Sequence, residues 1–398
     1  MSDSASFDTN VLIVGAGPAG LALSVALAQA GVRSLLLEQA PRGAVEQPAE
    51  DGRDIAMTYR SRRILDRLGL WQRLPQDDIA PLKAAQVTDG DSPRRLRFDG
   101  LSDGHEQLGW LVPNYRIRRA CFDGAMACGE RVRIEGDARV TSLVRDAHGA
   151  SVTLADGRRW RAPLVVAADS RFSTLRRLAG IGARMLDFGR TAIVCRLRHE
   201  LPHDGTAHEC FLHGHTLAML PMAGRQSSAV WTVTSDGAAD LMAASEAEFA
   251  DRVAAAFGHR LGAMELAAPR HAYPLVAVYA QQFTARRFAL VGDAAVGMHP
   301  VTAHGFNFGL YGVEVLAREL AAAARYGRDL GSPSTLGAYE REHRRTTLPI
   351  YLGTNFVVRL FTDDSAPARL ARRAVMDLTH WLPPVRSAVT RQLTGARA

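Results

Sequence analysis

The pattern of apolar positions predicts a strand, a helix and a second strand at the start of the chain. Residues 11–14 form a short β-branched apolar run, and residues 18–30 have helical composition that ends at Gly31. A second apolar run covers residues 34–37. Continuous apolar runs are typical of strands buried on both faces, as in parallel sheets that helices cover. The N-terminal region therefore predicts a βαβ unit.

The same two patterns continue as far as Gly180. Helical spacing of apolar residues predicts helices, and alternating or continuous apolar runs predict strands. The expected helices cover residues 58–68 and 117–126, and the expected strands cover residues 140–144, 151–154 and 164–167.

Beyond Gly180 the pattern changes to short strands separated by turn residues, which is typical of an antiparallel sheet. A second domain is therefore expected there. Its strands cover residues 192–198, 209–212, 216–220 and 228–234, and an amphipathic helix covers residues 245–257.

The last third of the chain returns to the pattern of the N-terminal region. A buried strand is expected over residues 288–291, followed by a glycine turn and a helix that extends to about Ala324. Residues 335–398 have helical composition, and prolines are expected to interrupt the helix. These prolines are Pro349, Pro367, Pro383 and Pro384.

Composition and charge narrow the classes of function. The chain has 398 residues, of which 47% are hydrophobic and 22% are charged, as in a globular protein of two or three domains. Lys and Arg number 48 against 41 Asp and Glu, but they form no long basic run, so no nucleic-acid partner is expected. The uncharged stretch from Thr9 to Val32 contains glycines and a proline, and no targeting segment is expected. The widely spaced cysteines fit a reducing cytosol.

The first chemical motif is a glycine-rich turn between the first predicted strand and helix. In this Gly-Ala-Gly-Pro-Ala-Gly segment, Gly15 permits the tight turn, Gly17 lets the backbone approach a diphosphate, and Gly20 lets helix and strand pack closely. The N–H groups of the helix N-terminus can bind the phosphates. Glu38, at the end of the next strand, can accept hydrogen bonds from a ribose. This arrangement predicts a dinucleotide site and does not distinguish FAD from NAD.

Two further motifs follow later strands. Asp293 lies in a Gly-Asp-Ala-Ala turn, where its carboxylate can hold a sugar-alcohol hydroxyl or cap a helix. A glycine-containing helix start at residues 304–309 can direct N–H groups at a flavin or form a packing turn. Asp169, with Arg171 and Arg176 nearby, can serve phosphates, serve a nicotinamide donor or form a surface turn. Each motif alone leaves both interpretations open.

The order of these three motifs resembles that of the single-component flavin monooxygenases of the aromatic-hydroxylase class, over essentially the whole chain. Within that class, the sequence is most similar to the ubiquinone-biosynthesis hydroxylases. The similar segments are residues 219–221, 292–295, 299–300, 305–310 and 360–369.

The resemblance implies an α/β fold in which a discontinuous, Rossmann-like FAD-binding domain is interleaved with an antiparallel-sheet substrate domain. A helical segment is expected at the C-terminus. The FAD-binding domain is expected over residues 1–75, 110–182 and 276–330, the substrate domain over residues 76–109 and 183–275, and the helical segment over residues 331–398.

The resemblance also assigns cofactor-binding roles by position. The ADP half of FAD would be held by Gly15, Gly17, Ala19, Gly20 and Glu38, and a phosphate would be contacted by Arg53. The flavin side would be contacted by Asn114, or by Arg118 in a shifted alignment. The dual FAD and NAD(P)H loop would contain Asp169, the ribitol would be held by Asp293, and the flavin ring would be held by Gly305, Phe306 and Asn307.

Two departures from the family pattern concern the surroundings of the flavin. Residues 167–170 are Ala-Ala-Asp-Ser where the family usually has Gly-Ala-Asp-Gly, so the loop lacks both glycines. His304 stands where the family more commonly has Gln. It would lie near the ring as a base or hydrogen-bond donor toward a phenol, or as an ordinary residue at a helix start.

The activity that the resemblance implies is hydroxylation of an aromatic ring with O₂ through a flavin C4a-hydroperoxide. Electrons would come from NAD(P)H or a protein donor, and the substrate would be a polyprenylated phenol in ubiquinone biosynthesis. Because the cofactor supplies the reactive oxygen, neither a catalytic triad nor a metal site is expected. The alternatives are a soluble hydroxylase of a small aromatic compound and a non-catalytic flavin-binding scaffold. Apolar candidates for lining the substrate cavity are Phe211, Met219, Leu220, Met222 and Trp231.

The C-terminal region bears on location in the cell. Arg369, Arg372 and Arg373 fall on one side of an expected helix whose other side is apolar. Such a helix can lie on an anionic membrane or pack on its own domain. We expect a cytoplasmic protein, with peripheral contact to the inner membrane and membership of a quinone-biosynthesis complex as further hypotheses.

Overall fold

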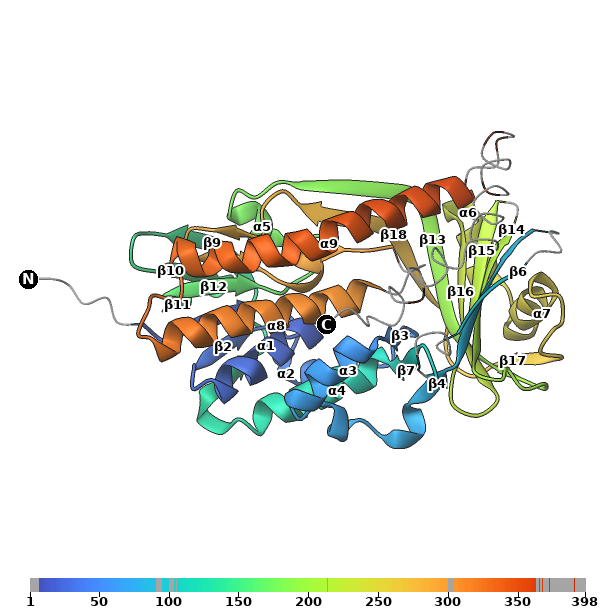
Figure 1. Ribbon diagram of the computed structural model, residues 1–398, viewed down its shortest axis with the longest axis horizontal. Coiled ribbons are helices and arrows are strands. Elements are labelled where there is room, and N and C mark those ends of the chain that lie inside the picture. The colour runs from blue at the N-terminus through green and yellow to red at the C-terminus, as the bar shows by residue number, and fades with distance from the viewer. Residues whose placement is uncertain are drawn as a thin grey trace, which may run out of the picture.

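The computed structural model describes residues 7–90, 95–99, 106–212, 214–299 and 304–362, together with Gly104, Ser365, Pro367, Arg372 and Thr390. The molecule is elongated, with a helix-covered, mainly parallel sheet toward one end and a large sheet at the other that is antiparallel except where β14 (Thr206–Leu212) pairs with β5 (Ala84–Asp89) (Figure 1). The predicted α/β fold class is confirmed.

A six-stranded sheet, parallel except at one edge, forms the first layer. Its strands lie in the order β19–β20–β12–β1–β2–β8. β1 (Val11–Val14) pairs in parallel with β12 (Leu164–Ala167) on one side and with β2 (Ser34–Leu37) on the other. Every residue of these three strands is buried, as their apolar runs predict. The remaining strands are β8 (Val132–Glu135), β19 (Thr284–Ala285) and β20 (Phe288–Leu290).

Helices from distant parts of the chain pack together on this sheet (Figure 1). α1 (Pro18–Gln29) contacts both α4 (Asn114–Met126) and α8 (His304–Arg325). α8 in turn contacts α9 (Pro333–Thr362). The shorter helices of this region are α2 (Arg42–Glu46), α3 (Tyr59–Arg67) and α5 (Thr174–Leu178).

Two small antiparallel sheets complete the helix-covered region. The predicted hairpin is confirmed as β9 (Val140–Arg145) and β10 (Ala150–Leu154), and β11 (Arg159–Ala162) pairs with β10. The second small sheet has the order β3–β7–β4. Its strands are β3 (Asp54–Met57), β4 (Ala80–Leu82) and β7 (Gly109–Pro113).

The large sheet contains the strands predicted beyond Gly180. Its order is β21–β18–β13–β16–β15–β14–β5–β6, and β17 pairs with β13 beside this path. The strands are β5 (Ala84–Asp89), β6 (Arg95–Asp99), β13 (Ala183–His199), β14 (Thr206–Leu212), β15 (His215–Pro221), β16 (Gln226–Thr234), β17 (Met264–Leu266), β18 (His271–Ala280) and β21 (Val296–Gly297).

The two faces of the large sheet have different neighbours. One face packs on α6 (Ser235–Ala243) and α7 (Glu246–Ala256) and forms a separate core. On the other face, Arg196 of β13 forms an ion pair with Asp54 of β3 at 2.6 Å, so this face is directed toward the helix-covered region. Because side chains alternate along a strand, the register decides which residues point toward each region. Buried members of the separate core are Ile193, Cys195, Leu217, Met219, Trp231 and Phe249.

Several sequence expectations differ from the structure. β13 begins at Ala183, earlier than residue 192, because a register irregularity between Asp187 and Thr191 disturbs its alternation. β18 does not stand out in the sequence, and it spans residue 276, where one domain boundary is expected. The full domain division stays a prediction.

The expected helix break at Pro349 is wrong, since α9 continues through this residue. A proline inside a helix leaves the carbonyl four residues earlier without its partner. Pro349 and Arg345 are both exposed, so water can bind that carbonyl while neighbouring residues keep α9 packed. The expected breaks at Pro383 and Pro384 lie outside the residues that the structure describes.

Candidate functional site

The glycine turn after β1 has the geometry that its three predicted roles require. Gly15 has a φ of +109°, and a Cβ there would lie 2.4 Å from the carbonyl oxygen of Ala168. A Cβ on Gly20 would lie 2.0 Å from the carbonyl oxygen of Gly15. At Gly17, by contrast, a Cβ would meet no atom within 4 Å. The two outer glycines are therefore required by packing, while the middle one borders open space where a diphosphate can approach.

Glu38 lies directly beside this turn. One carboxylate oxygen accepts a hydrogen bond from the N–H of Ala16 at 2.8 Å, and the other accepts from the N–H of Ala40 at 3.0 Å. Each oxygen has further lone pairs, so a ribose hydroxyl can bind while the backbone holds the carboxylate in place. The ribose contact itself stays a prediction.

Asp169 packs against the same turn from the end of β12. Its Oδ2 accepts from the N–H of Leu175 at 3.4 Å. Its Oδ1 is buried and has no hydrogen-bond partner among the residues that the structure describes. A buried oxygen without a partner is unfavourable in a folded protein, and next to a nucleotide-binding turn it is consistent with a ligand that donates to it.

Asp293 lies on a short 3₁₀ turn, Gly292–Ala294, that is packed tightly between two helices. Gly292 has a φ of +63°, and a Cβ there would lie 3.1 Å from the Cβ of Ala19 in α1. A Cβ on Gly309 of α8 would lie 3.2 Å from the Cα of Gly292. The starts of α1 and α8 therefore meet at the turn that carries Asp293. The predicted ADP-binding and flavin-binding segments come together at this point.

Two arginines join the Asp169 segment to the Asp293 turn. Arg171 donates to Asp293 Oδ2 at 2.8 Å and to the carbonyl of Val276 at 3.0 Å. Arg176 is buried and donates to the carbonyl of Ala294 at 2.9 Å. The sequence offers phosphate or nicotinamide roles for these arginines. In the structure, both make contacts that hold the Asp169 segment against the Asp293 turn.

Arg53 is part of a polar cluster that the sequence does not predict. Its guanidinium forms an ion pair with Asp51 at 2.6 Å, and Asn114 donates to the same carboxylate oxygen at 2.7 Å. Burial alone would raise the pKa of Asp51, but the hydrogen bonds from Arg53 and Asn114 outweigh it and lower that pKa. Tyr273 of β18 donates to the Asp51 carbonyl at 2.7 Å. The only sequence signal for Asp51 is its position two residues before Arg53.

The two alignments proposed for the flavin side place Asn114 and Arg118 one helical turn apart on α4. Asn114 is buried, and its amide donates to Asp51. Arg118 is half-buried, and no hydrogen bond or ion pair joins it to any described residue. Arg118 therefore keeps hydrogen-bond donors for a ligand, whereas the amide of Asn114 is engaged by Asp51, and the contact with the flavin side stays a prediction.

The first turn of α8 is held in place by the side chain of Asn307. Its Oδ1 accepts from the hydroxyl of Ser61 at 2.6 Å and from the N–H of Thr58 at 3.2 Å. Its amide donates to the carbonyl of Ala56 at 2.9 Å. These contacts occupy the side chain, so Asn307 orients the helix end, and any contact with a flavin ring falls to the backbone of this turn. α8 begins at His304, whose side chain lies outside the described part of the structure.

Two buried residues of α9, Tyr339 and His343, contact the start of α8 and the end of β20. Tyr339 donates to the carbonyl of Leu290 at 2.5 Å, and its hydroxyl lies 3.0 Å from Nδ1 of His343. Nε2 of His343 lies 3.2 Å from the carbonyl of Phe308. Burial lowers the pKa of His343 to about 4, so the ring is neutral at pH 7. This pair fixes the end of β20 relative to the start of α8.

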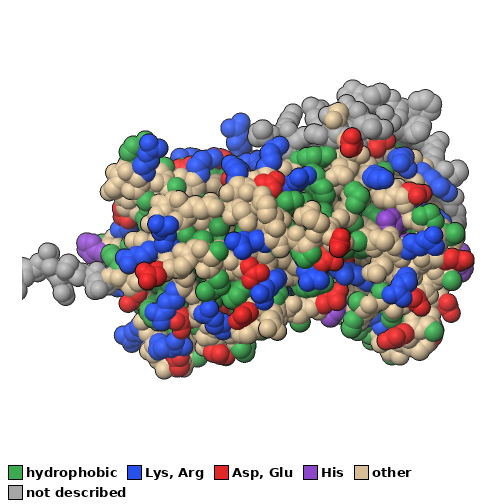
Figure 2. Space-filling view, turned by 90° about the horizontal axis from the view of Figure 1, so that it is seen from below, with side chains coloured by type: hydrophobic (Ala, Val, Ile, Leu, Met, Phe, Trp, Pro, Cys, Tyr) green, Lys and Arg blue, Asp and Glu red, His purple; other side chains and the backbone are tan. Residues whose placement is uncertain are grey.

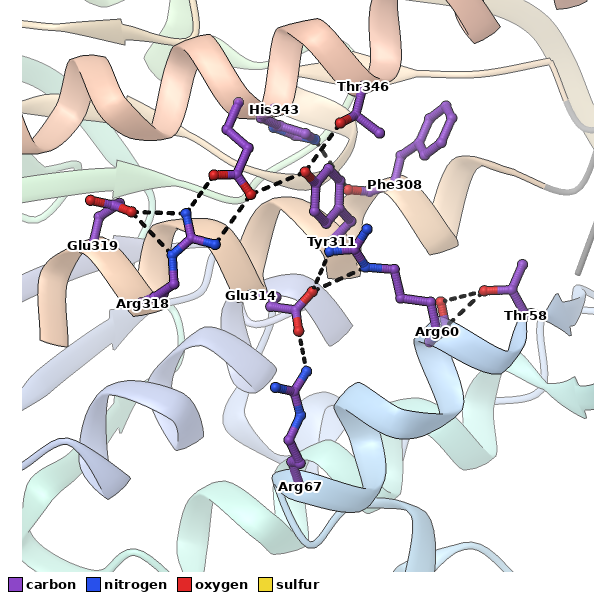
Figure 3. Close-up of polar contacts among 12 residues, drawn as sticks. Thr58, Arg60, Arg67, Phe308, Tyr311, Glu314, Arg318, Glu319, His343 and Thr346 are labelled. Carbon is purple, nitrogen blue, oxygen red and sulfur yellow. Dashed lines mark hydrogen bonds and ion pairs between the residues drawn. The ribbon is translucent and has the colours of Figure 1, made fainter. Parts of the chain in front are cut away.

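An ion-pair cluster on the surface of α8 ties α3 to the same helix (Figure 3). Glu314 of α8 accepts from Arg60 at 2.9 Å and also pairs with Arg67. The Arg60 guanidinium lies 3.9 Å from the centre of the Tyr311 ring. Because Thr58 caps α3 and contacts Asn307, this cluster helps to hold the helix end that faces the site.

A mostly apolar cavity lies between the large sheet and α9. Its volume is about 20 Å³, enough for about one water molecule. Burial and the charge of Arg171 lower the pKa of His299, one of its lining residues, to about 4. The His299 ring is therefore neutral at pH 7, and it lies edge-on to the Phe188 ring at 4.8 Å. The lining residues are Phe188, Arg190, Phe211, Thr216, Thr232, His299 and Val358.

Only one of the apolar residues proposed to line a substrate cavity does so. Phe211 lines the cavity, whereas Met219 and Trp231 point to the opposite face of the sheet and belong to the core around α7. Leu220 and Met222 pack in a small cluster against the β3–β7–β4 sheet. The physical reason is the strand alternation, which places neighbours in sequence on opposite faces. His299, which the sequence marks only as part of a motif, is the residue that the structure adds.

Surface charge, membrane-spanning helices, metal sites and the predicted basic helix are the other features that bear on function. The face in Figure 2 shows Lys and Arg side chains interspersed with Asp and Glu. Among the described residues, no helix combines the length and apolar character needed to span a membrane. In that same part of the chain, no His, Cys, Asp or Glu side chains form a group of three or more that could hold a metal ion. Arg369 and Arg373 of the predicted basic helix lie outside the described residues, and Arg372 is buried and pairs with Asp89 at 3.5 Å, so Arg372 is not part of an exposed basic face.

Comparisons with known proteins agree with this geometry. The model of the FAD binding domain family matches residues 8–348. The ubiquinone hydroxylase UbiM of Neisseria meningitidis is 41% identical over 394 residues, covering 98% of this chain and 85% of that protein. The ubiquinone hydroxylase UbiL of Rhodospirillum rubrum is 39% identical over 395 residues, covering 99% of this chain and 91% of that protein.

A solved structure, that of the p-nitrophenol 4-monooxygenase PnpA from Pseudomonas putida, has the same fold. Its TM-score is 0.79 at 20% sequence identity, covering 98% of this chain and 99% of that one. The predicted resemblance is thus confirmed, and the chain belongs to the FAD binding domain family, as an FAD-dependent monooxygenase of the aromatic-hydroxylase class.

Proposed function

We propose that this protein hydroxylates the aromatic ring of a prenylated phenol in ubiquinone biosynthesis. The observation that carries the proposal is the near full-length similarity to two ubiquinone hydroxylases, at 41% and 39% identity. The apolar lining of the cavity supports it, because an aromatic ring with an alkyl chain that widens this space would be buried with favourable free energy.

The residues at the convergence of α1, α8 and the Asp293 turn fit FAD. The open space at Gly17 and the unpartnered Oδ1 of Asp169 leave room and hydrogen-bonding capacity for it. Arg171 engages Oδ2 of Asp293, so Oδ1 can accept a hydrogen bond from a ribitol hydroxyl. When bound, FAD would supply the activation of O₂, with two electrons taken from NAD(P)H or a protein donor.

The protein's own contribution is to bind, orient and exclude water. Glu38 would hold the ribose, the N-terminus of α1 the diphosphate, and Arg118 a phosphate. Phe188 and Phe211 would hold the substrate ring between apolar walls that exclude water from the reacting atoms. Neutral His299 would act as a hydrogen-bonding group at this wall, and His304 stands as the proposed base or donor from the start of α8.

A second candidate is hydroxylation of a small phenol without a lipid chain. The small cavity favours it, since a space of about 20 Å³ has to widen less for a single ring than for a ring with a long prenyl chain. The first candidate predicts faster turnover of a phenol with a prenyl chain, and the second predicts faster turnover of the same phenol without it. For the first candidate, we propose that the prenyl chain lies outside the cavity along α9, where Leu352 and Phe356 are 49% and 64% exposed.

Peripheral membrane contact and membership of a biosynthetic complex form part of the same proposal. A prenylated phenol partitions into the bilayer, so an enzyme that acts on it gains from a membrane-facing surface. The exposed apolar residues on α9 support such contact, whereas Arg372 of the basic segment gives no support because it is buried and pairs with Asp89. Sedimentation with anionic vesicles, compared with neutral ones, tests this part separately.

The test of the function begins with the cofactor. Purified protein is expected to show an oxidised-flavin spectrum and to release FAD on denaturation. The FAD-bound protein is then supplied with NAD(P)H, ¹⁸O₂ and either a short-chain 2-prenylphenol or unsubstituted phenol. A product heavier by one ¹⁸O atom with the prenylated ring supports the proposal. Turnover of unsubstituted phenol but not of the prenylated phenol supports the second candidate. Bound FAD with no consumption of NAD(P)H and no product supports a scaffold.

A further inference from the structure

A carboxyl group lies on the cavity-facing side of the large sheet, outside the motifs described above. Glu209 is in the middle of β14, where its Cα partners are Val87 on β5 and Ala218 on β15. Side chains two residues apart on a strand point to the same face. Glu209 therefore shares its face with Phe211, which lines the cavity, whereas its neighbours His208 and Cys210 point to the opposite face.

The neighbouring strands confirm which face this is. Thr216 and Thr232 line the cavity and lie in the same cross-strand row as Phe211. The adjacent row contains Val87, Glu209 and Ala218 and continues to Val230 on β16. Glu209 is thus the carboxyl group in an otherwise apolar row that runs alongside the row lining the cavity.

The Glu209 carboxyl makes no structural contact with a polar group among the described residues. The side chain is half-buried, and no hydrogen bond or ion pair connects it with any residue that the structure describes. Burial raises its pKa to about 8, so the carboxyl is mostly neutral at pH 7. A carboxyl with a raised pKa and no partner, set among apolar side chains, is characteristic of functional sites.

We propose that Glu209 is a specificity-determining residue that hydrogen-bonds the hydroxyl group of the substrate's aromatic ring. This inference rests on the proposed function and adds to it the polar group that recognises a phenol. A neutral carboxyl can accept a hydrogen bond from the phenol through its carbonyl oxygen or donate one through its own hydroxyl. The aromatic and apolar residues of the cavity would bind any ring of suitable size, so Glu209 supplies the distinction between a phenol and a benzene.

The size of this distinction follows from the cost of leaving a buried polar group unpaired. A site that hydrogen-bonds a substrate hydroxyl rejects the analogue without it strongly, because the protein group then loses its partner. The pair of probes is a short-chain 2-prenylphenol and the corresponding prenylbenzene, which differ only in the hydroxyl. Wild-type protein is expected to bind the phenol at least about 10-fold more tightly.

The experiment compares four FAD-bound proteins: wild type, Glu209→Leu, Glu209→Gln and Glu265→Leu. Glu265 lies on β17 of the same sheet with its side chain 63% exposed, which makes it the matched control. The dissociation constant of each probe is measured from its perturbation of the flavin absorbance, and KM and kcat are measured for the phenol. Glu209→Leu is expected to lose the preference for the phenol by at least about 10-fold, mainly through Kd and KM. Glu209→Gln, which keeps hydrogen-bonding atoms in place, is expected to retain most of it, and the control is expected to behave as wild type.

Two results would overturn the inference. If Glu209→Leu keeps the wild-type preference for the phenol, the carboxyl does not contact the hydroxyl. If Glu209→Gln loses as much as Glu209→Leu, the effect is not a matter of hydrogen bonding, and the inference fails. Failure of the proposed function has a different signature, because wild-type protein would then form no ¹⁸O-labelled product from the phenol, whatever the binding preference of Glu209→Leu.

Discussion

Replacing Glu209 with leucine is expected to stabilise the protein by an amount that grows with pH. The carboxyl has its ordinary pKa of 4.5 in the unfolded chain and a pKa of about 8 in the folded protein. Because the folded-state pKa is the higher one, the folded state holds the proton more tightly. The wild type therefore keeps its full stability below about pH 4.5 and loses stability as the pH rises toward 8.

The magnitude follows from these two pKa values. A tenfold change in proton affinity corresponds to about 1.4 kcal/mol, and between pH 5 and pH 8 the lost stability amounts to about 3 kcal/mol. Leucine has no titrating group and fits the apolar row formed by Val87 and Ala218. For a chain of 398 residues, about 3 kcal/mol corresponds to a change in Tm of about 4 °C.

The assay is differential scanning calorimetry of FAD-saturated wild type and Glu209→Leu at half-unit intervals from pH 5 to pH 8. The difference in Tm is expected to widen steadily over this range in favour of the variant. Thr232→Val, which changes a non-titrating side chain on the same face of the sheet, is the control and should differ from wild type by a constant amount. Parallel Tm curves for wild type and Glu209→Leu would refute the assignment of a raised pKa to an unpaired Glu209 carboxyl.

Three further predictions concern the cofactor site and its supports. Gly20→Ala is expected to abolish FAD binding, because its Cβ would lie 2.0 Å from the Gly15 carbonyl oxygen. Gly17→Ala is expected to fold normally and to bind FAD more weakly, and the flavin content and circular dichroism of the two variants distinguish these outcomes. His343→Ala is expected to cost about 3 kcal/mol of stability and to weaken FAD binding, since it removes the buried group between Tyr339 and the first turn of α8; a variant with unchanged denaturation midpoint would contradict this. Arg196→Met is expected to lower the free energy of unfolding by about 3–5 kcal/mol, because the fully buried side chain of Asp54 loses its ion-pair partner. Urea denaturation measures this loss, and adding Asp54→Leu to the variant should recover part of the stability.

The local features of the nucleotide-binding half could be predicted from the sequence. β1, α1 and β2 begin and end within a residue of their predicted bounds, and the roles of Gly15 and Gly20 agree with their close contacts. These features depend on short-range physics: apolar runs long enough to be buried, and a turn whose backbone conformation glycine alone adopts without strain. The order of three such motifs along the chain was sufficient to indicate the family.

The arrangement of the site depends on contacts between residues far apart in the chain. Arg171 and Asp293 are separated by 122 positions, and Asn114 and Asp51 by 63. No local pattern encodes such pairs, because each needs two elements to be brought together by the packing of the sheet. The break expected at Pro349 fails for the same reason, since the packing of α9 outweighs a local preference.

The substrate side shows most clearly what only the tertiary structure decided. In the sequence, Glu209 is one of 41 acidic residues, and Phe211 and Trp231 are equivalent apolar residues on predicted strands. The register of β14 with β5 and β15 places Glu209 and Phe211 on the cavity face, while Trp231 belongs to the core on the opposite face. A shift of one residue would reverse these faces, and the register is set by the burial of two different surfaces across the whole sheet. The sequence by itself therefore determined the cofactor-binding turn and the family, and the pairing of the strands determined which side chains face the cavity.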